Sequence, residues 1–146
     1  MLKLVGLGGT FDHFHEGHKL LLKTALRVSK KVFVGVTSDQ LLKNKKYSPQ
    51  LQDYSQREEN VISFLKSTGN MEKCEIVKLN DPYGPPIHES EYEGIVVSQE
   101  TYNNALKINQ IREEKGFDPL IIVVIPYVKN KDNERISSTK IREKLA

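Results

Sequence analysis

Five short apolar runs divide the chain at fairly regular intervals. Most of these runs are rich in Val, Ile and Leu, and their apolar residues follow one another without alternating polar positions. This pattern is typical of strands that are buried on both faces, as in parallel sheets. We therefore expect strands at residues 2–7, 31–37, 75–79, 94–98 and 120–125.

Between these runs, apolar residues recur with the spacing of a helix. In the first such stretch, Leu21, Ala25 and Val28 fall on one stripe, with Leu22 and Leu26 beside it. In the last full stretch, the apolar face consists of Ala105, Ile108 and Ile111. The predicted helices cover residues 16–29, 39–43, 55–67 and 101–115, with a last short helix from Ser137 or Ser138.

Capping and turn residues mark several of the expected boundaries. Ser55 is the expected N-cap of its helix, because Glu58 stands three residues later, as in a capping box. Gly69 and Gly116 end two helices, and Pro126 ends the last strand. Strand and helix thus alternate along the chain, which predicts a doubly wound α/β fold with a five-stranded parallel sheet. In such a sheet, ligands bind at the carboxyl ends of the strands.

The composition fits one ordinary globular domain and argues against several other classes of protein. The chain has 146 residues, of which 28% are charged, so we expect a single domain over residues 1–146. The net charge of +3 comes without an arginine-rich or aromatic–basic stripe, so we expect no nucleic-acid partner. With no leader or long apolar segment, the expected location is cytoplasmic, without membrane contact. The lone Cys74 is expected in a half-buried or edge strand.

The loop after the first expected strand carries the strongest chemical signal. Gly8 and Gly9 allow the backbone to approach a phosphate, and the following helix presents free N–H groups and a positive dipole end. His15 and His18 stand three residues apart at the start of that helix, which places both rings on one face of its first turn. Gly17 between them leaves room for a nucleotide against the helix. The pattern indicates a phosphate-binding site.

Two neighbouring histidines do not by themselves specify a phosphate site. Such pairs are common on ordinary surfaces, and a metal site would need a third ligand that this segment lacks. The position of this pair, after a strand, a glycine-rich turn and Thr10, favours the phosphate site over both a plain surface pair and a metal site.

Two short segments here resemble the nucleotidyltransferase superfamily. Residues 9–12 read Gly-Thr-Phe-Asp and residues 15–18 read His-Glu-Gly-His, which match the Gly-Thr-Phe-Asp and His-x-Gly-His that the superfamily has after its first strand. The resemblance implies a Rossmann-like nucleotidyltransferase fold in which His15 and His18 contact the triphosphate, and His18 stabilises charge on the α-phosphate in the transition state. It further implies that Thr10 orients the acceptor phosphate. Together, the geometry and the resemblance predict these nucleotide-binding residues: Gly8, Gly9, Thr10, Phe11, His15, Gly17 and His18.

A second signature stands near the carboxyl end of the chain, where residues 136–142 read Ile-Ser-Ser-Thr-Lys-Ile-Arg. A serine cap followed by free backbone N–H groups can bind an anion, although such a segment is often only a helix cap. The segment resembles the superfamily's Ile-Ser-Ser-Thr-x-x-Arg motif, which grips the β- and γ-phosphates. The residues that take this role by resemblance are Ser137, Ser138, Thr139 and Arg142.

The middle of the chain narrows the resemblance. Residues 81–85 read Asp-Pro-Tyr-Gly-Pro and residues 97–102 read Val-Ser-Gln-Glu-Thr-Tyr. Both stretches are similar to phosphopantetheine adenylyltransferases of the archaeal and eukaryotic type, and the similarity extends over nearly the whole chain. It implies transfer of AMP from ATP to 4′-phosphopantetheine, giving dephospho-coenzyme A and pyrophosphate. Mg²⁺ is expected as a counter-ion held mainly by the nucleotide, because the sequence has no carboxylate cluster for a metal site of the protein.

The expected acceptor site lies beside the nucleotide site. Bacterial enzymes of the same activity use a basic residue after the second strand, and we assign this role to Lys43, with Lys45 and Lys46 as alternatives or solvated loop residues. The arginines that those enzymes carry after the fourth strand have no counterpart here. Asp81 and Tyr83, in a turn-rich loop over residues 81–86, are the expected wall for the pantetheine arm.

Arg57, near the start of a predicted helix, has a more ordinary interpretation. We expect it to form an ion pair on the helix surface.

Three alternatives stay open on the sequence alone. A nicotinamide mononucleotide adenylyltransferase or a cytidylyltransferase would use the same chemistry on another acceptor, although residues 132–137 lack the glycine of the cytidylyltransferase pattern. A non-catalytic module would bind ATP without releasing pyrophosphate. An RNA-binding role like that of class I aminoacyl-tRNA synthetases would need additional domains. The sequence carries no signal for the oligomeric state.

Overall fold

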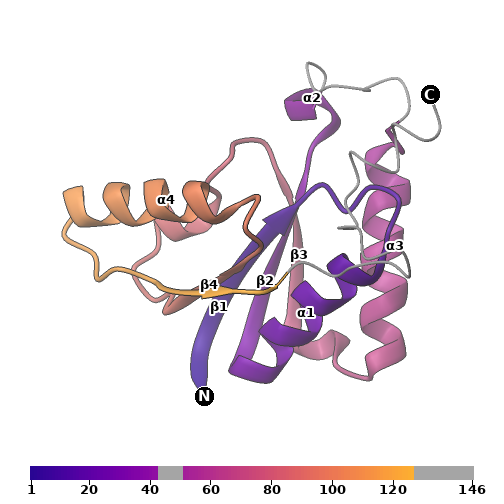
Figure 1. Cartoon of the computed structure of the whole chain (residues 1–146), viewed down its shortest axis with the longest axis horizontal. Coiled ribbons are helices and arrows are strands. Elements are labelled where there is room, and N and C mark those ends of the chain that lie inside the picture. The colour runs from indigo at the N-terminus through magenta and orange to yellow at the C-terminus, as the bar shows by residue number, and fades with distance from the viewer. Residues whose placement is uncertain (43–50, 127–146) are drawn as a thin grey trace.

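A five-stranded parallel sheet forms the centre of the computed structural model, which describes residues 1–42 and 51–126 (Figure 1). Its strands are β1 (Leu2–Gly9), β2 (Ser29–Thr37), β3 (Cys74–Leu79), β4 (Gly94–Val97) and β5 (Ile121–Val124). Their order in space is β3-β2-β1-β4-β5, so the direction of winding reverses between β1 and β4. The doubly wound α/β fold predicted from the sequence is confirmed.

Helices cover both faces of this sheet. Figure 1 shows α1 (Glu16–Val28) and α3 (Tyr54–Thr68) on one side and α4 (Tyr102–Glu114) on the other. The short helix α2 (Asp39–Leu42) follows β2 at its carboxyl end, and two 3₁₀ turns are η2 (Met71–Lys73) and η3 (Pro85–Ile87). The predicted helix at Ser137 or Ser138 lies outside the described residues.

The core divides into two layers because successive strand residues point to opposite faces of the sheet. Val32, Val34 and Val36 of β2 pack in the layer that α1 and α3 cover, whereas Phe33 packs in the layer of α4. The predicted helix stripe is found here, since Leu21, Leu22 and Ala25 of α1 are buried in the first layer. The sheet is thus anchored on both faces, and its carboxyl edge is held in place for a site.

The start of α3 differs from the predicted cap. Asp53 is the N-cap, and its carboxylate accepts a hydrogen bond from the backbone N–H of Gln56 at 2.9 Å. Ser55 lies inside the first turn, and Glu58 accepts from the hydroxyl of Tyr54 instead, so the predicted capping box is wrong. The carboxylate two residues earlier takes the cap because an aspartate satisfies the same free N–H groups. Gly69 does end the helix, in a left-handed conformation with φ of 76°.

The two edges of the sheet are β3 and β5. Cys74 begins β3 and is half-buried, as predicted. β5 is less covered than its apolar sequence indicates: Ile121 is 56% exposed and Val124 is 42% exposed. A run of apolar residues predicts a strand but does not tell a central strand from an edge strand. Across residues 1–42 and 51–126, no helix has the length and apolar character needed to cross a membrane.

Candidate active site

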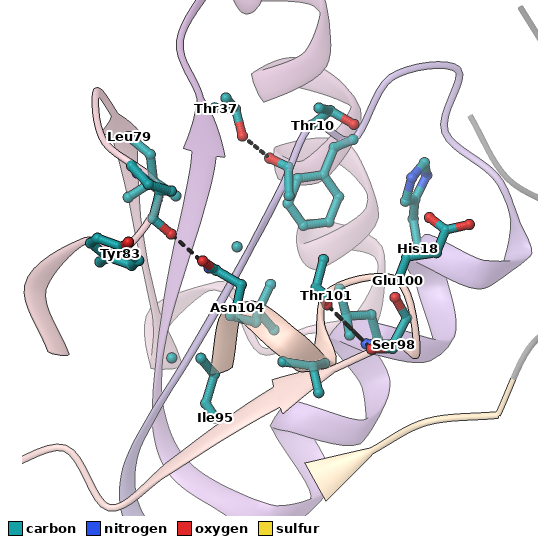
Figure 2. A pocket seen from close by; sticks show the side chains of 18 of the residues that line it. Thr10, His18, Thr37, Leu79, Tyr83, Ile95, Ser98, Glu100, Thr101 and Asn104 are labelled. Carbon is teal, nitrogen blue, oxygen red and sulfur yellow. Dashed lines mark hydrogen bonds between the residues drawn. The ribbon is translucent and has the colours of Figure 1, made fainter. Parts of the chain in front are cut away.

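A pocket of about 340 Å³ lies at the carboxyl edge of the sheet, above the ends of β1 and β4, where the winding direction changes (Figure 2). Doubly wound sheets bind their ligands at this point. The structure brings together in this pocket every predicted site residue that it describes: Gly8, Gly9, Thr10, Phe11, His15, Gly17, His18, Asp81 and Tyr83. The other predicted site residues lie outside the described part of the chain: Lys43, Ser137, Ser138, Thr139 and Arg142.

The two histidines form a capping box at the start of α1. His15 is the N-cap, and its Nδ1 accepts a hydrogen bond from the backbone N–H of Gly17 at 3.0 Å. The Nδ1 of His18 accepts in turn from the backbone N–H of His15 at 3.1 Å. A ring nitrogen that accepts carries no proton, so each neutral imidazole holds its proton on Nε2. The helix start therefore fixes two pocket-lining rings as hydrogen-bond donors.

Both rings are neutral near pH 7. Burial lowers the pKa of His15 to about 4, against a smaller opposite effect of Glu16. The pKa of His18 is lowered to about 3, chiefly by burial and to a smaller extent by the neighbouring His15. The rings stack with centroids 3.8 Å apart, as the three-residue spacing predicts, and like charges at this distance would repel. The site thus offers N–H donors and the positive end of α1 to an anion, without a charged imidazole.

The backbone between Gly9 and His15 is strained. Phe11 has a φ of 54° and His13 a φ of 46°, a left-handed region in which a bulky residue is uncommon. Phe11 is nevertheless fully buried, and its ring lies 5.4 Å from the ring of His18. The strained turn therefore places an aromatic side chain directly against the histidine that the sequence singles out.

The segment before α3 holds this strained turn. The backbone N–H of Gln52 donates to the fully buried carboxylate of Asp12 at 2.8 Å. The side-chain oxygen of Gln52 accepts from the backbone N–H of His13 at 3.1 Å and from Asn60 at 3.0 Å. Sequence reasoning missed Gln52, because its contacts join segments about forty residues apart in the chain.

Arg57 is a correction to the sequence-based prediction. Its side chain is 0% exposed, so it is not a residue of the helix surface. Its guanidinium does pair with Asp39 at 2.8 Å, but its other three hydrogen bonds go to backbone carbonyls near the pocket. These carbonyls belong to Thr10 (2.9 Å), Thr37 (2.7 Å) and Gln52 (3.0 Å).

A signal for the burial of Arg57 was present in the helical spacing. Arg57, Val61 and Leu65 recur every four residues and are the buried residues of α3. The position belongs to the apolar stripe, and a charged residue on such a stripe indicates a buried, fully bonded side chain.

The opposite wall of the pocket is the loop that contains Asp81 and Tyr83. One carboxylate oxygen of Asp81 accepts from the backbone N–H groups of Tyr83 and Gly84, both at 2.8 Å. This oxygen of Asp81 therefore holds the turn. The sequence analysis assigned Asp81 to the acceptor wall and did not predict this role in the turn. Asn104 of α4 donates to the carbonyl of Pro82 at 2.8 Å and ties the loop to the helix (Figure 2).

A second buried arginine, which does not line the pocket, holds the chain segment that follows this loop. Arg112 of α4 is fully buried, and its hydrogen bonds to the described residues go to backbone carbonyls. It occupies the buried stripe of α4 after Ala105 and Ile108, where the sequence predicted Ile111. Its partners are the carbonyls of Pro86 (2.6 Å), Glu89 (3.1 Å), Ser90 (3.2 Å), Tyr92 (3.2 Å) and Asp118 (2.8 Å).

The pocket has a polar end and an apolar part. Thr10 and the two histidines form the polar end, together with residues after β4 that the sequence analysis left without a role: Ser98, Glu100 and Thr101. Leu79, Ile95 and Ile108 line the apolar part, and Figure 2 shows Leu79 and Ile95. A ligand with an anionic group and a less polar chain fits these surroundings.

The described residues offer no ready metal site. Over residues 1–42 and 51–126, no three His, Cys, Asp or Glu side chains gather closely enough to hold a metal ion. A cation in this pocket would therefore be held mainly by a phosphorylated ligand.

Comparison with known proteins agrees with the geometry. Residues 7–144 match the family model described as cytidylyltransferase-like. The chain is 45% identical to the phosphopantetheine adenylyltransferase of Pyrococcus abyssi over 143 residues, which are 98% of this chain and 90% of the relative. It is also 45% identical to the protein of that name from Methanosarcina mazei over 140 residues, which are 94% of this chain and 88% of the relative.

Solved structures show the same fold. A protein of unknown function from Archaeoglobus fulgidus is 38% identical, with a TM-score of 0.75 over 85% of this chain and 98% of its own. A bifunctional NMN adenylyltransferase/ADP ribose pyrophosphatase from Francisella tularensis matches 99% of this chain and 42% of its own. Its TM-score is 0.65 at 19% identity, so this likeness concerns the fold alone.

Proposed function

Because the chain belongs to the cytidylyltransferase-like family and, within it, to the phosphopantetheine adenylyltransferases, it is an enzyme that transfers AMP from ATP to 4′-phosphopantetheine, and we propose that the pocket around His18 is its active site. The products are dephospho-coenzyme A and pyrophosphate, so the reaction belongs to coenzyme A biosynthesis. The observation that carries the assignment is the capping box of His15 and His18, two residues that line the pocket at a helix N-terminus.

In the proposed mechanism, the triphosphate of ATP lies at the start of α1. A phosphate oxygen of the acceptor attacks the α-phosphorus in line, a new P–O bond forms, and the bond to the bridging oxygen of pyrophosphate breaks. Thr10 orients the acceptor phosphate, and His18 donates from Nε2 to the α-phosphate oxygens as charge develops there. His15 donates to the triphosphate beside it. Pyrophosphate leaves toward Ser137, Ser138, Thr139 and Arg142, the second signature of the sequence.

The pKa values support a role as donors over a role in proton transfer. With a pKa of about 3, His18 carries no second proton to give at pH 7. The reaction requires none, because the attacking phosphate oxygen is already ionised and the leaving pyrophosphate is stabilised by its surroundings. Mg²⁺ enters with ATP as part of the substrate, since the described residues supply no cluster of ligands of their own.

The apolar part of the pocket suits the pantetheine arm of the acceptor. The chain of this acceptor is far less polar than its phosphate, and Leu79, Ile95, Ile108 and Tyr83 surround that part of the pocket. Lys43 stays the proposed basic ligand of the acceptor phosphate.

We further propose that the chain works as one domain on small molecules in the cytoplasm, without nucleic-acid or membrane partners. Its ordinary composition supports this proposal.

Pyrophosphate release with Mg-ATP tests the substrate. We expect release with 4′-phosphopantetheine and none above background with nicotinamide mononucleotide or glycerol 3-phosphate. Release with another acceptor would keep the chemistry and change the substrate. ATP binding without release for any of the three acceptors would contradict the catalytic assignment.

Replacing Tyr83 with alanine tests the acceptor wall. The turn itself is held by the backbone groups that bond Asp81, so it should survive the loss of the ring. We expect KM for phosphopantetheine to rise about tenfold, the factor that roughly 1.4 kcal/mol of lost contact gives, while KM for ATP stays within about twofold. Tyr102→Ala is the control, because Tyr102 is exposed and does not line the pocket. An equal rise of both KM values would argue against this wall.

A further inference from the structure

We propose that Arg57 is a positioning residue for nucleotidyl transfer, which holds Thr10 and the end of β2 in one fixed arrangement. The inference rests on the proposed function, because Thr10 is the residue assigned to the acceptor phosphate. Arg57 does not line the pocket, so it acts through the backbone that it bonds.

The burial of Arg57 points to a geometric role. A guanidinium that is 0% exposed loses its hydration, and a single carboxylate partner that is 60% exposed does not restore it. Buried ion pairs are weak evidence for stability, because apolar residues of similar volume often replace them without loss. What an apolar residue cannot supply is a fixed fork of donors, and Arg57 uses four of its N–H bonds.

One nitrogen of Arg57 joins the two strand ends. Nη1 donates to the carbonyl of Thr10 at 2.9 Å and to the carbonyl of Thr37 at 2.7 Å. Thr37 also donates its hydroxyl to the carbonyl of Gly9 at 3.0 Å (Figure 2). The carbonyls at the exits of β1 and β2 are thus held within hydrogen-bond distance of a single atom, and the Thr10 carbonyl lies where the chain leaves the sheet.

The remaining bonds of Arg57 reach the supports of the strained turn. Nε donates to the carbonyl of Gln52. The backbone N–H of Gln52 in turn donates to Asp12, and its side-chain oxygen accepts from the backbone N–H of His13. Nη2 donates to Asp39 at the start of α2, and the other carboxylate oxygen of Asp39 accepts from the backbone N–H of Tyr54 at 3.2 Å. Arg57 therefore connects the β1–α1 turn, the β2–α2 junction and the start of α3.

The expected consequence is a loss in kcat with little change in affinity for ATP. Displacing a reacting group by about 1 Å can cost about a hundredfold in rate. The histidine rings are held by α1 itself, through the bonds of Gly17 to His15 and of His15 to His18, whereas the guanidinium of Arg57 bonds other segments. Loosening Arg57 should therefore shift Thr10 relative to His18 and leave the nucleotide donors intact.

Arg112 provides a matched control for a purely structural role. It is as buried as Arg57 and bonds five carbonyls, but none of them belongs to the β1–α1 turn or to β2. We would compare Arg57→Lys and Arg112→Lys by Tm, kcat and the KM values for ATP and phosphopantetheine. We expect both to lose thermal stability, but only Arg57→Lys to lose about 10- to 100-fold in kcat with KM for ATP within about threefold.

A second pair keeps the test decisive if a buried variant fails to fold. Asp39→Ala removes an exposed partner of Arg57, whereas Asp53→Ala removes an exposed carboxylate that caps α3 and does not bond the side chain of Arg57. We expect kcat to fall several-fold for Asp39→Ala and to stay at the wild-type value for Asp53→Ala, although the latter loses a helix cap.

Equal kcat losses within either pair, or a kcat for Arg57→Lys at the wild-type value, would overturn the positioning role. Wild-type pyrophosphate release with phosphopantetheine is measured alongside. Its absence would count against the proposed function, whereas its presence together with equal losses counts against Arg57 alone.

Discussion

Replacing His18 with alanine should lower kcat by about 10²–10³-fold, the usual cost of removing one donor that stabilises charge in a transition state. The Nδ1 of His18 is occupied by the backbone N–H of His15, so Nε2–H is the donor that this ring offers to a ligand. Charge on the α-phosphate oxygens grows as pyrophosphate leaves, and the donor is worth most at that moment. KM for ATP should therefore change much less than kcat.

The measurement is steady-state pyrophosphate release, with circular dichroism to show that the variant folds. His88→Ala is the control, because His88 follows η3 and does not line the pocket. We expect His88→Ala to keep wild-type turnover. Near-normal turnover of His18→Ala would refute the assignment of His18, and a rise in KM with kcat unchanged would reduce it to ground-state binding.

The sequence predicted most of the fold because its strands carry a strong local signal. The apolar runs of β1, β2 and β4 are buried on both faces, and helices recur between them at regular spacing. The histidine pair was also predictable, since three-residue spacing at a helix start brings two rings onto one face, and they stack at 3.8 Å. Local spacing was enough in both cases because the relevant contacts lie within one element.

The sequence did not predict the features that depend on distant segments. Arg57 and Arg112 are polar residues on apolar helix stripes, and only the fold shows which carbonyls they satisfy. Gln52 reaches a turn about forty residues away. Gly8 was predicted as part of a loop, but it pairs with Gly35 in the sheet, where a Cβ would lie 3.1 Å from Leu79. Helical spacing can indicate that Arg57 is buried, but the partners in each of these cases come from packing between elements, which local patterns do not specify.

The free energy of unfolding should fall steeply between pH 7 and pH 4, chiefly because of His18. The unfolded chain binds a proton on this residue below its ordinary pKa of 6.5, whereas burial lowers the folded pKa to about 3. The unfolded state therefore binds more protons throughout this window, and stability falls as pH falls. Each pH unit costs about 1.4 kcal/mol, or about 3 kcal/mol for His18 at pH 4. His15, with a pKa of about 4, adds a smaller amount because water reaches it more easily.

This loss is a large share of the roughly 5–15 kcal/mol that stabilises a typical domain. The double variant His15→Asn, His18→Gln isolates its source, because asparagine is a good N-cap and glutamine at the third helical position completes a capping box. Neither replacement titrates, so the variant should match the wild type at pH 7 and be the more stable protein at pH 4.5 in urea unfolding. The titration of Asp39 does not affect this pH range. Burial opposes the ionisation of Asp39, but its hydrogen bonds from Arg57 and Tyr54 outweigh the effect of burial and lower its pKa below 3.8. The stabilising contribution of Asp39 is therefore lost only in stronger acid. Parallel loss of stability in both proteins between pH 7 and 4.5 would show that the imidazoles are not buried in their neutral form, and would remove the basis for treating them as fixed donors.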